Sequence, residues 1–279
     1  MRGRTMITTD EVVIDESNIL DVLRRSHALH VKNANDIEYL INYEKGDQPL
    51  QRKKTYRPDI DCQCSDNVAN EVTEFNTGFK WGNAITLVQT GDGSDEEISE
   101  AVSELNKQYA MARIKAKTQE LGRYVEICGI CNVYVDINME WRKGKPLFEL
   151  DVLDPRSSFV VRSSYYPDKR IMLGVTYRHD SISGNTYYTC YTKDQRFEVV
   201  NLQSEVTSPS KWAHMERSGE ENPLHIVPIT EYIRSYDRMG AWERYIDEMD
   251  NLNLLISDFT NDVEQNTHCL LYTSPSPRD

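Results

Sequence analysis

The chain has 279 residues, enough for one large domain or two ordinary domains with a substantial core. Its formal net charge of -13 argues against a general nucleic-acid-binding protein, which would carry a basic surface. The charge does not exclude a channel for nucleic acid, because an acidic wall repels DNA and lets it slide. We find neither a run of about 18 apolar residues nor a signal-peptide pattern, so we expect a cytoplasmic product without a membrane span.

The first part of the chain is predicted to be mainly helical. Residues 1–16 are polar and irregular, which indicates a mobile arm, and a helix then runs to about His30. A second helix begins near Asn35 and stops at Gly46. The basic cluster over 52–57 is typical of a solvated loop, with a phosphate-contacting site as the alternative. Further predictions are a helix over 65–78, a strand over 84–88 and one helix over 94–121.

From residue 124 onwards the apolar residues recur with period two, which indicates strands. The first predicted strand covers Tyr124 to Ile137 and bends at Cys128 to Cys131. Short strands separated by turns follow, and this spacing is typical of an antiparallel sheet. We predict them over 148–153, 159–162, 171–177, 187–191, 197–202 and 226–232. The predicted fold class is therefore α+β, with N-terminal helices and an antiparallel sheet followed by one long amphipathic helix.

The long helix is predicted over Gly240 to Asn266, with Asp237 as its cap, and would be about 40 Å long. Its apolar residues are spaced three and four apart and form one seam: Trp242, Tyr245, Met249, Leu252, Ile256, Phe259 and Val263. Acidic residues occupy its other faces, toward solvent or a channel: Glu243, Asp247, Glu248, Asp250, Asp258, Asp262 and Glu264. A helix with such a seam needs other helices beside it.

The last eleven residues differ from the rest of the chain. Residues 269–279 read CLLYTSPSPRD, a Ser/Pro-rich segment without periodicity. A disordered tail would have this composition, but we interpret the segment as the translation of a sequencing adapter and therefore as not native. We expect the natural reading frame to be cut just after the long helix.

The sequence shows no convincing catalytic or metal-binding constellation. Without Cys269 the cysteines number five, which gives no disulfide framework. Cys128 and Cys131 have the spacing of a metal clamp or a redox pair, but in a strand they are more typical of buried packing. A four-cysteine zinc site with Cys62 and Cys64 would need an unusual one-residue gap. We therefore predict no enzyme, no cofactor and no metal.

The order of several phrases resembles the portal proteins of tailed bacteriophages, of the kind found in long-tailed phages. The resemblance covers roughly residues 36 to 266 and is strongest in the last forty. It rests on five phrases in this order: WGNAITLV from Trp81, Leu153-Asp154-Pro155, Val227-Pro228-Ile229, Gly240 to Glu243, and Ser257-Asp258 with Asn261-Asp262-Val263-Glu264. The chain departs from the family pattern at Arg234-Ser235-Tyr236, where the family commonly has an asparagine-containing turn.

The resemblance implies a division of the chain and a structural role. Residues 1–34 would be an arm and first helix, 35–236 the wing-like α+β domain, and 237–268 the first stem helix, without the clip, returning stem helix, tunnel loop and crown. The subunit would form a dodecameric ring at the head vertex of the virion, assembled in the host cytoplasm, through which double-stranded DNA is packaged and ejected. The implied partners are the terminase large subunit, the head-tail adaptor, and the scaffold and major capsid proteins.

Two other functions remain open from the sequence. One is a phage enzyme, such as a nuclease, with its catalytic half downstream of the cut. The other is a structural adaptor or attachment protein, which the tyrosine-rich strands suggest. The continuation of the reading frame would discriminate between them, because a portal requires a small insert followed by a second long helix.

Overall fold

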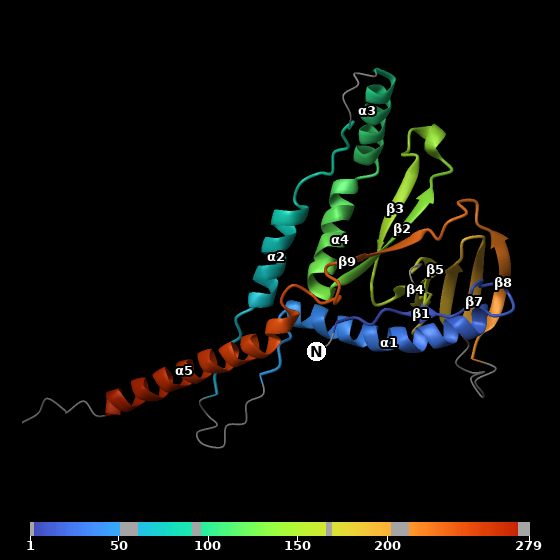
Figure 1. Ribbon diagram of the computed structural model, residues 1–279. Coiled ribbons are helices and arrows are strands. Elements are labelled where there is room, and N and C mark those ends of the chain that lie inside the picture. Colours follow the sequence, from blue (N-terminus) through green and yellow to red (C-terminus); the bar gives the residue numbers. More distant parts are fainter. Residues whose placement is uncertain (1–2, 51–60, 91–95, 166–168, 202–211, 273–279) are drawn as a thin grey trace, which may run out of the picture.

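The computed structural model describes residues 3–50, 61–90, 96–165, 169–201 and 212–272. Within these ranges the chain forms an elongated α+β molecule, in which a body of helices and two sheets carries a last helix that projects from one end (Figure 1). The predicted fold class is confirmed. The described residues include no helix that is long and apolar enough to cross a membrane. The basic cluster over 52–57 lies outside the described ranges.

The larger sheet has six strands in the order β1-β4-β5-β6-β7-β8. Its neighbouring strands are antiparallel, except that the short β1 pairs with β4 in parallel. The strands are β1 (Thr8–Thr9), β4 (Ser158–Ser163), β5 (Ile171–His179), β6 (Thr186–Tyr191), β7 (Gln195–Asn201) and β8 (His214–Glu221). Strand β8 is not among the predicted strands, because its sequence HMERSGEE lacks apolar alternation and it lies at the edge of the sheet.

The smaller sheet has the order β3-β2-β9 and is antiparallel: β2 (Ile130–Ile137), β3 (Phe148–Leu153) and β9 (Ile229–Ile233). Helix α4 (Ile114–Cys128) packs on it through Leu121 and Val125. The strand predicted from Tyr124 was therefore wrong in its first half, which is the end of α4. Gly129 makes the turn from helix to strand with φ of 77°, a backbone conformation that favours glycine.

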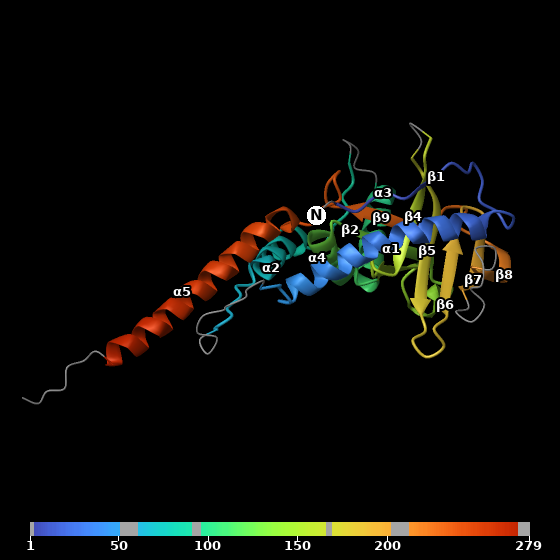
Figure 2. The same ribbon diagram turned by 90° about the horizontal axis from the view of Figure 1, so that it is seen from below.

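Helix α1 (Ile19–Glu44) is one continuous helix, where the sequence predicted two. It lies across the larger sheet at one end and reaches the base of the last helix at the other (Figure 2). Ile19 and Leu23 pack in a first core cluster with strands β4 to β7, whereas Ile37 and Leu40 pack in a second cluster with α2 (Val68–Trp81) and Trp242. Asn33, near the predicted break, is buried and helical.

The prediction of a mobile arm was wrong, because residues 4–14 pack against the body. Ile7 and Ile14 are buried in the first core cluster, and Thr8 and Thr9 pair with Arg162 and Ser163 of β4. These apolar residues are spaced by seven positions, which is too sparse for a periodicity signal. The arm is held by contacts distant in sequence that local patterns do not reveal.

Three asparagines on helices each bind both backbone groups of one residue in an extended segment. Asn33 of α1 pairs with Thr5 at 2.9 and 2.8 Å. Asn106 of α3 (Glu96–Met111) pairs with Leu87 at 2.9 Å in both bonds. Asn261 pairs with Cys62 at 2.7 and 3.1 Å. The strand predicted over 84–88 was wrong. The backbone of Leu87 binds the side chain of Asn106 and not a neighbouring strand, so no sheet forms there.

Two helices of the structure begin or end at other residues than the sequence predicted. The helix predicted over 94–121 is divided into α3 and α4 by Arg113, whose φ is 55°. The last helix, α5, covers Ile246–Tyr272 and follows a short 3-10 turn over Glu243–Tyr245. Asp237 is therefore not its cap, and its carboxylate instead accepts a hydrogen bond from Ser235 and pairs with Arg244. Residues 273–279 of the predicted non-native segment lie outside the described ranges.

Candidate functional site

The base of α5 is anchored in the second core cluster. Trp242 is only 2% exposed, its ring stacks on Tyr43 with centroids 5.5 Å apart, and its Nε1 donates to Thr73 Oγ1 at 2.9 Å. Ile246 and Met249 are buried in the same cluster. Trp242 and Met249 of the predicted seam are therefore used inside the subunit and are not available to a neighbour.

Glu243, the first residue of the predicted acidic face, is not exposed. Glu243 is buried and forms an ion pair with Arg4 of the arm, and both side chains are 0% exposed. Its other carboxylate oxygen accepts from the Gly240 backbone at 2.9 Å, while Arg4 also donates to the Cys128 carbonyl at 3.1 Å. A buried charge needs such a partner, so this pair joins the arm, the end of α4 and the start of α5.

The face of α5 that points to the body is polar beyond Met249. Asn253, Ser257 and Asn261 are each at most 1% exposed and lie four residues apart. They bind the backbone of a strap, which we define as residues 61–66. Asp66 N donates to Asn253 Oδ1 at 2.8 Å, Cys64 N to Ser257 Oγ at 3.0 Å, and Cys62 N to Asn261 Oδ1 at 2.7 Å.

The spacing of this polar row follows from two regular geometries. Four residues of an α-helix rise about 6.0 Å. Two residues of an extended chain span about 6.6 Å. Residues 253, 257 and 261 of the helix can therefore bind residues 66, 64 and 62 of an antiparallel extended strap in register. Ser257 and Asn261 belong to the phrases that carry the family resemblance, and the structure gives them a role that spacing alone did not indicate.

A second face of α5 is apolar and exposed. Tyr245 is 59% exposed, Leu252 40%, Phe259 71% and Val263 49%, whereas Ile256 is half-buried. Leu255, which the seam pattern omitted, is 66% exposed and lies next to this stripe. We call these six residues the exposed seam. Within the described part of the chain nothing covers it.

A third face of α5 is acidic, with Asp247, Asp258 and Asp262 all exposed, whereas the exposed Glu248 lies within the apolar stripe in angle. Asp250 lies nearer the body and accepts a hydrogen bond from Tyr43 Oη at 2.8 Å. Glu264 is exposed but is close in angle to the polar row. Because each helical residue turns by about 100°, the polar, apolar and acidic faces follow one another at intervals of roughly 120°.

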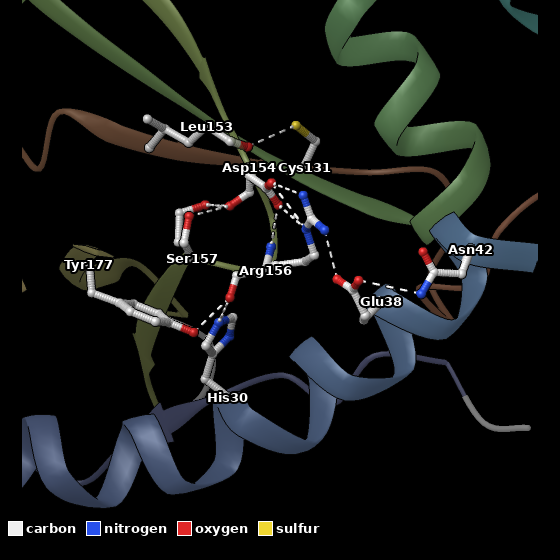
Figure 3. A network of polar contacts seen from close by, with 10 residues as sticks. His30, Glu38, Asn42, Cys131, Leu153, Asp154, Arg156, Ser157 and Tyr177 are labelled. Atoms are coloured by element: carbon white, nitrogen blue, oxygen red, sulfur yellow. Dashed lines mark hydrogen bonds and ion pairs between the residues drawn. The ribbon is translucent and has the colours of Figure 1, made fainter. Parts of the chain in front are cut away.

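The Leu153-Asp154-Pro155 phrase lies at the junction between α1 and the two sheets (Figure 3). Arg156 donates to both carboxylate oxygens of Asp154 at 2.6 to 3.1 Å and to Glu38 of α1 at 2.7 Å. Burial opposes ionisation of Asp154, but the Arg156 hydrogen bonds and charge outweigh it and lower its pKa. The Arg156 carbonyl accepts from Tyr177 Oη at 2.6 Å and lies 3.1 Å from His30 Nε2. This junction is a structural brace.

The other candidate chemical groups are placed in the core. Cys128 and Cys131 are buried, and burial raises the pKa of both thiols. Cys128 is the last residue of α4 and Cys131 lies in β2, so the predicted strand position is wrong for Cys128 and right for Cys131. Burial likewise lowers the pKa of His27 and of His30 to about 4. Among the described residues, no group of three or more His, Cys, Asp and Glu side chains is arranged to hold a metal ion.

Comparison with known families gives one clear result. The model of the family described as phage portal protein, SPP1 Gp6-like, matches residues 29–268, which is most of the chain. A comparison with curated proteins found no significant match. The matched range includes α1 from its middle onward, every strand of the two sheets except β1, the strap and the projecting helix with its exposed seam. The chain therefore belongs to the family of phage portal proteins of the SPP1 Gp6-like type.

Proposed function

We propose that the chain is the wing and first stem helix of a portal subunit, and that its exposed seam packs against helices of neighbouring subunits in a ring. Portal proteins are structural components of the phage head that form homo-oligomeric rings. The observation that carries the proposal is α5, which leaves the body with an apolar stripe of which Phe259 is 71% exposed (Figure 1). Burial of such a stripe stabilises a helical assembly by about 25 cal/mol for each Å².

The three faces of α5 suit a helix in a ring of identical subunits. The polar row fixes the helix to its own subunit, which leaves the exposed seam for heterologous contacts that repeat around a closed ring. The acidic face, with Asp247, Asp258 and Asp262, is then left for solvent or for the DNA that passes through. Repulsion from an acidic wall favours sliding of DNA over tight binding.

In this function the subunit is not an enzyme. The ring serves as a conduit for double-stranded DNA during packaging and ejection, at the head vertex of the virion. It binds the terminase large subunit, the head-tail adaptor, and the scaffold and capsid proteins. The dodecameric state and these partners come from the family resemblance.

The test is the association of the chain in solution. Leu252→Ser, Phe259→Ser and Val263→Ser together should shift the chain from oligomers toward monomers in analytical ultracentrifugation and mass photometry, because they remove the apolar contact. Ile182→Ser is the matched control, since Ile182 is 98% exposed on the turn between β5 and β6, and it should change nothing. The proposal fails if the unmodified chain stays monomeric at every concentration.

A further inference from the structure

The strap holds two cysteines whose thiols are in contact. Cys62 Sγ lies 3.4 Å from Cys64 Sγ, and both residues are half-buried. Alternate residues of an extended segment point to the same side, which explains why these two side chains meet although Gln63 separates them. The pair is therefore reachable from solvent, unlike Cys128 and Cys131, which are buried in the body.

The backbone of both cysteines is fixed by α5. Asn261 binds the N–H and the carbonyl of Cys62, and Ser257 binds the N–H and the carbonyl of Cys64, with four hydrogen bonds of 2.7 to 3.1 Å. Asn261 and Ser257 are themselves at most 1% exposed and helical. The two thiols thus sit on a rigid support that sets the distance between them.

This distance suits chelation of a soft ion better than a disulfide. Two thiolates on one tetrahedral zinc, with bonds of about 2.3 Å, lie roughly 3.8 Å apart. The observed 3.4 Å between the Sγ atoms is close to this value. A disulfide needs an S–S bond of about 2.05 Å and Cβ atoms about 3.8 Å apart. An extended segment separates alternate Cα atoms by about 6.6 Å, at the upper end of the roughly 4.4 to 6.8 Å found across disulfides, and the two Sγ atoms would have to move well inside the observed 3.4 Å.

We propose that Cys62 and Cys64 form a preorganised dithiol site for a thiophilic divalent cation of the zinc and cadmium class. Binding converts the two thiols into thiolates, each bonded to the ion, and releases two protons to solvent without any redox change. No third His, Cys, Asp or Glu in the described ranges completes the group. Within these ranges the protein supplies two ligands, and water takes the other positions of the ion.

Because two protons must leave, the affinity for the cation should increase as the pH is raised.

The site is tested by titrating the full chain with Cd²⁺ and following thiolate-to-cadmium absorption and the heat of binding. The expected result is one ion per chain, lost in Cys62→Ser and in Cys64→Ser and kept in Cys128→Ala/Cys131→Ala. Cys190 and Cys269 remain in every variant as a common background of single thiols. Phenylarsine oxide in excess glutathione gives a second readout, because it condenses with two adjacent thiols and releases water.

The support by α5 is tested separately. Asn261→Ala with Ser257→Ala should weaken Cd²⁺ binding about tenfold or more, because the thiols lose their preorganisation. Unchanged affinity would show that the local sequence alone chelates the ion and would overturn the preorganised site. Binding that survives in Cys62→Ser, or no binding to the unmodified chain, would overturn the site itself. Neither outcome depends on ring assembly, which the seam variants test. Circular dichroism of each variant checks that it is folded.

Discussion

At the scale of single residues, the buried pair of Arg4 and Glu243 fixes the direction in which α5 leaves the body. Both side chains are fully buried, and their other partners are the Cys128 carbonyl and the Gly240 backbone. Three segments far apart in sequence therefore meet at one charge pair. Sequence patterns did not indicate it, because an arginine in an irregular arm and a glutamate on an acidic helix each have the composition of a solvated surface.

Removing one charge of this pair should be strongly destabilising. Arg4→Met leaves the Glu243 carboxylate buried without its cation, and we expect a loss of about 3 to 5 kcal/mol in the free energy of unfolding. The double variant Arg4→Met/Glu243→Gln should regain part of it. Arg244→Met is the matched control, because Arg244 is 65% exposed in its pair with Asp237 and should contribute at most about 1 kcal/mol. Urea denaturation measures all three, and equal losses in the Arg4 and Arg244 variants would contradict this assignment.

His30, which is buried, and His27, which is half-buried, predict sensitivity to acid. The folded-state pKa of His27 and of His30 is about 4, below the usual 6.5, so the unfolded chain binds protons more readily between these values. Their contribution is complete above pH 6.5 and is lost as the pH falls toward 4. The expected loss is roughly 3 kcal/mol for each histidine.

Denaturation at several pH values between 7.5 and 4.5 tests this expectation. In His27→Phe, stability should fall less steeply as the pH decreases, because a phenylalanine keeps the ring packing against Tyr177 and Tyr188 without taking up a proton. His214→Gln, an exposed position on β8, serves as the control and should keep the slope of the unmodified chain. An equal slope in the unmodified chain and the His27 variant would refute the prediction.

At the scale of elements, helix-borne asparagines position the segments that lack regular structure. An asparagine amide presents an NH2 donor group beside a carbonyl acceptor, so it can bind both backbone groups of one residue as a neighbouring strand would. Asn33, Asn106 and Asn261 do this for the arm, for Leu87 and for the strap. The stronger periodic patterns, including the hairpins of the larger sheet and the long helix, could be predicted from the sequence. Which extended segment rests on which helix could not, because the hydrogen bonds join residues up to 199 positions apart.

A crossed pair of variants tests this role. Asn261→Ala should accelerate hydrogen exchange of the Cys62 amide by roughly tenfold to a hundredfold, because one hydrogen bond of about 1 to 3 kcal/mol is lost. It should leave the Leu87 amide unchanged. Asn106→Ala should do the reverse, so each variant is the control for the other. If both amides responded equally to either variant, the effect would be global destabilisation and the local role would be wrong.

At the scale of the whole molecule, the candidate surface was only partly visible in the sequence. The spacing of three and four identified Leu252, Phe259 and Val263, which the structure leaves exposed. It also included Trp242 and Met249, because a periodicity cannot tell an apolar residue that packs within the subunit from one that awaits a partner. The portal family was identified correctly because its phrases coincide with structural requirements, such as the Asp154 brace and the buried Ser257 and Asn261.

Helix α1 is one stiff element that connects the larger sheet to the base of α5. Its 26 residues span about 39 Å without a proline or a break, with one end seated in the larger sheet and the other against the base of α5. A tilt of about 3° around one end would displace the other by roughly 2 Å over that length. Since close-packed cores do not absorb such a shift by deforming, a displacement of the sheet end of α1 is transmitted to the base of α5 as a change in the angle of α5.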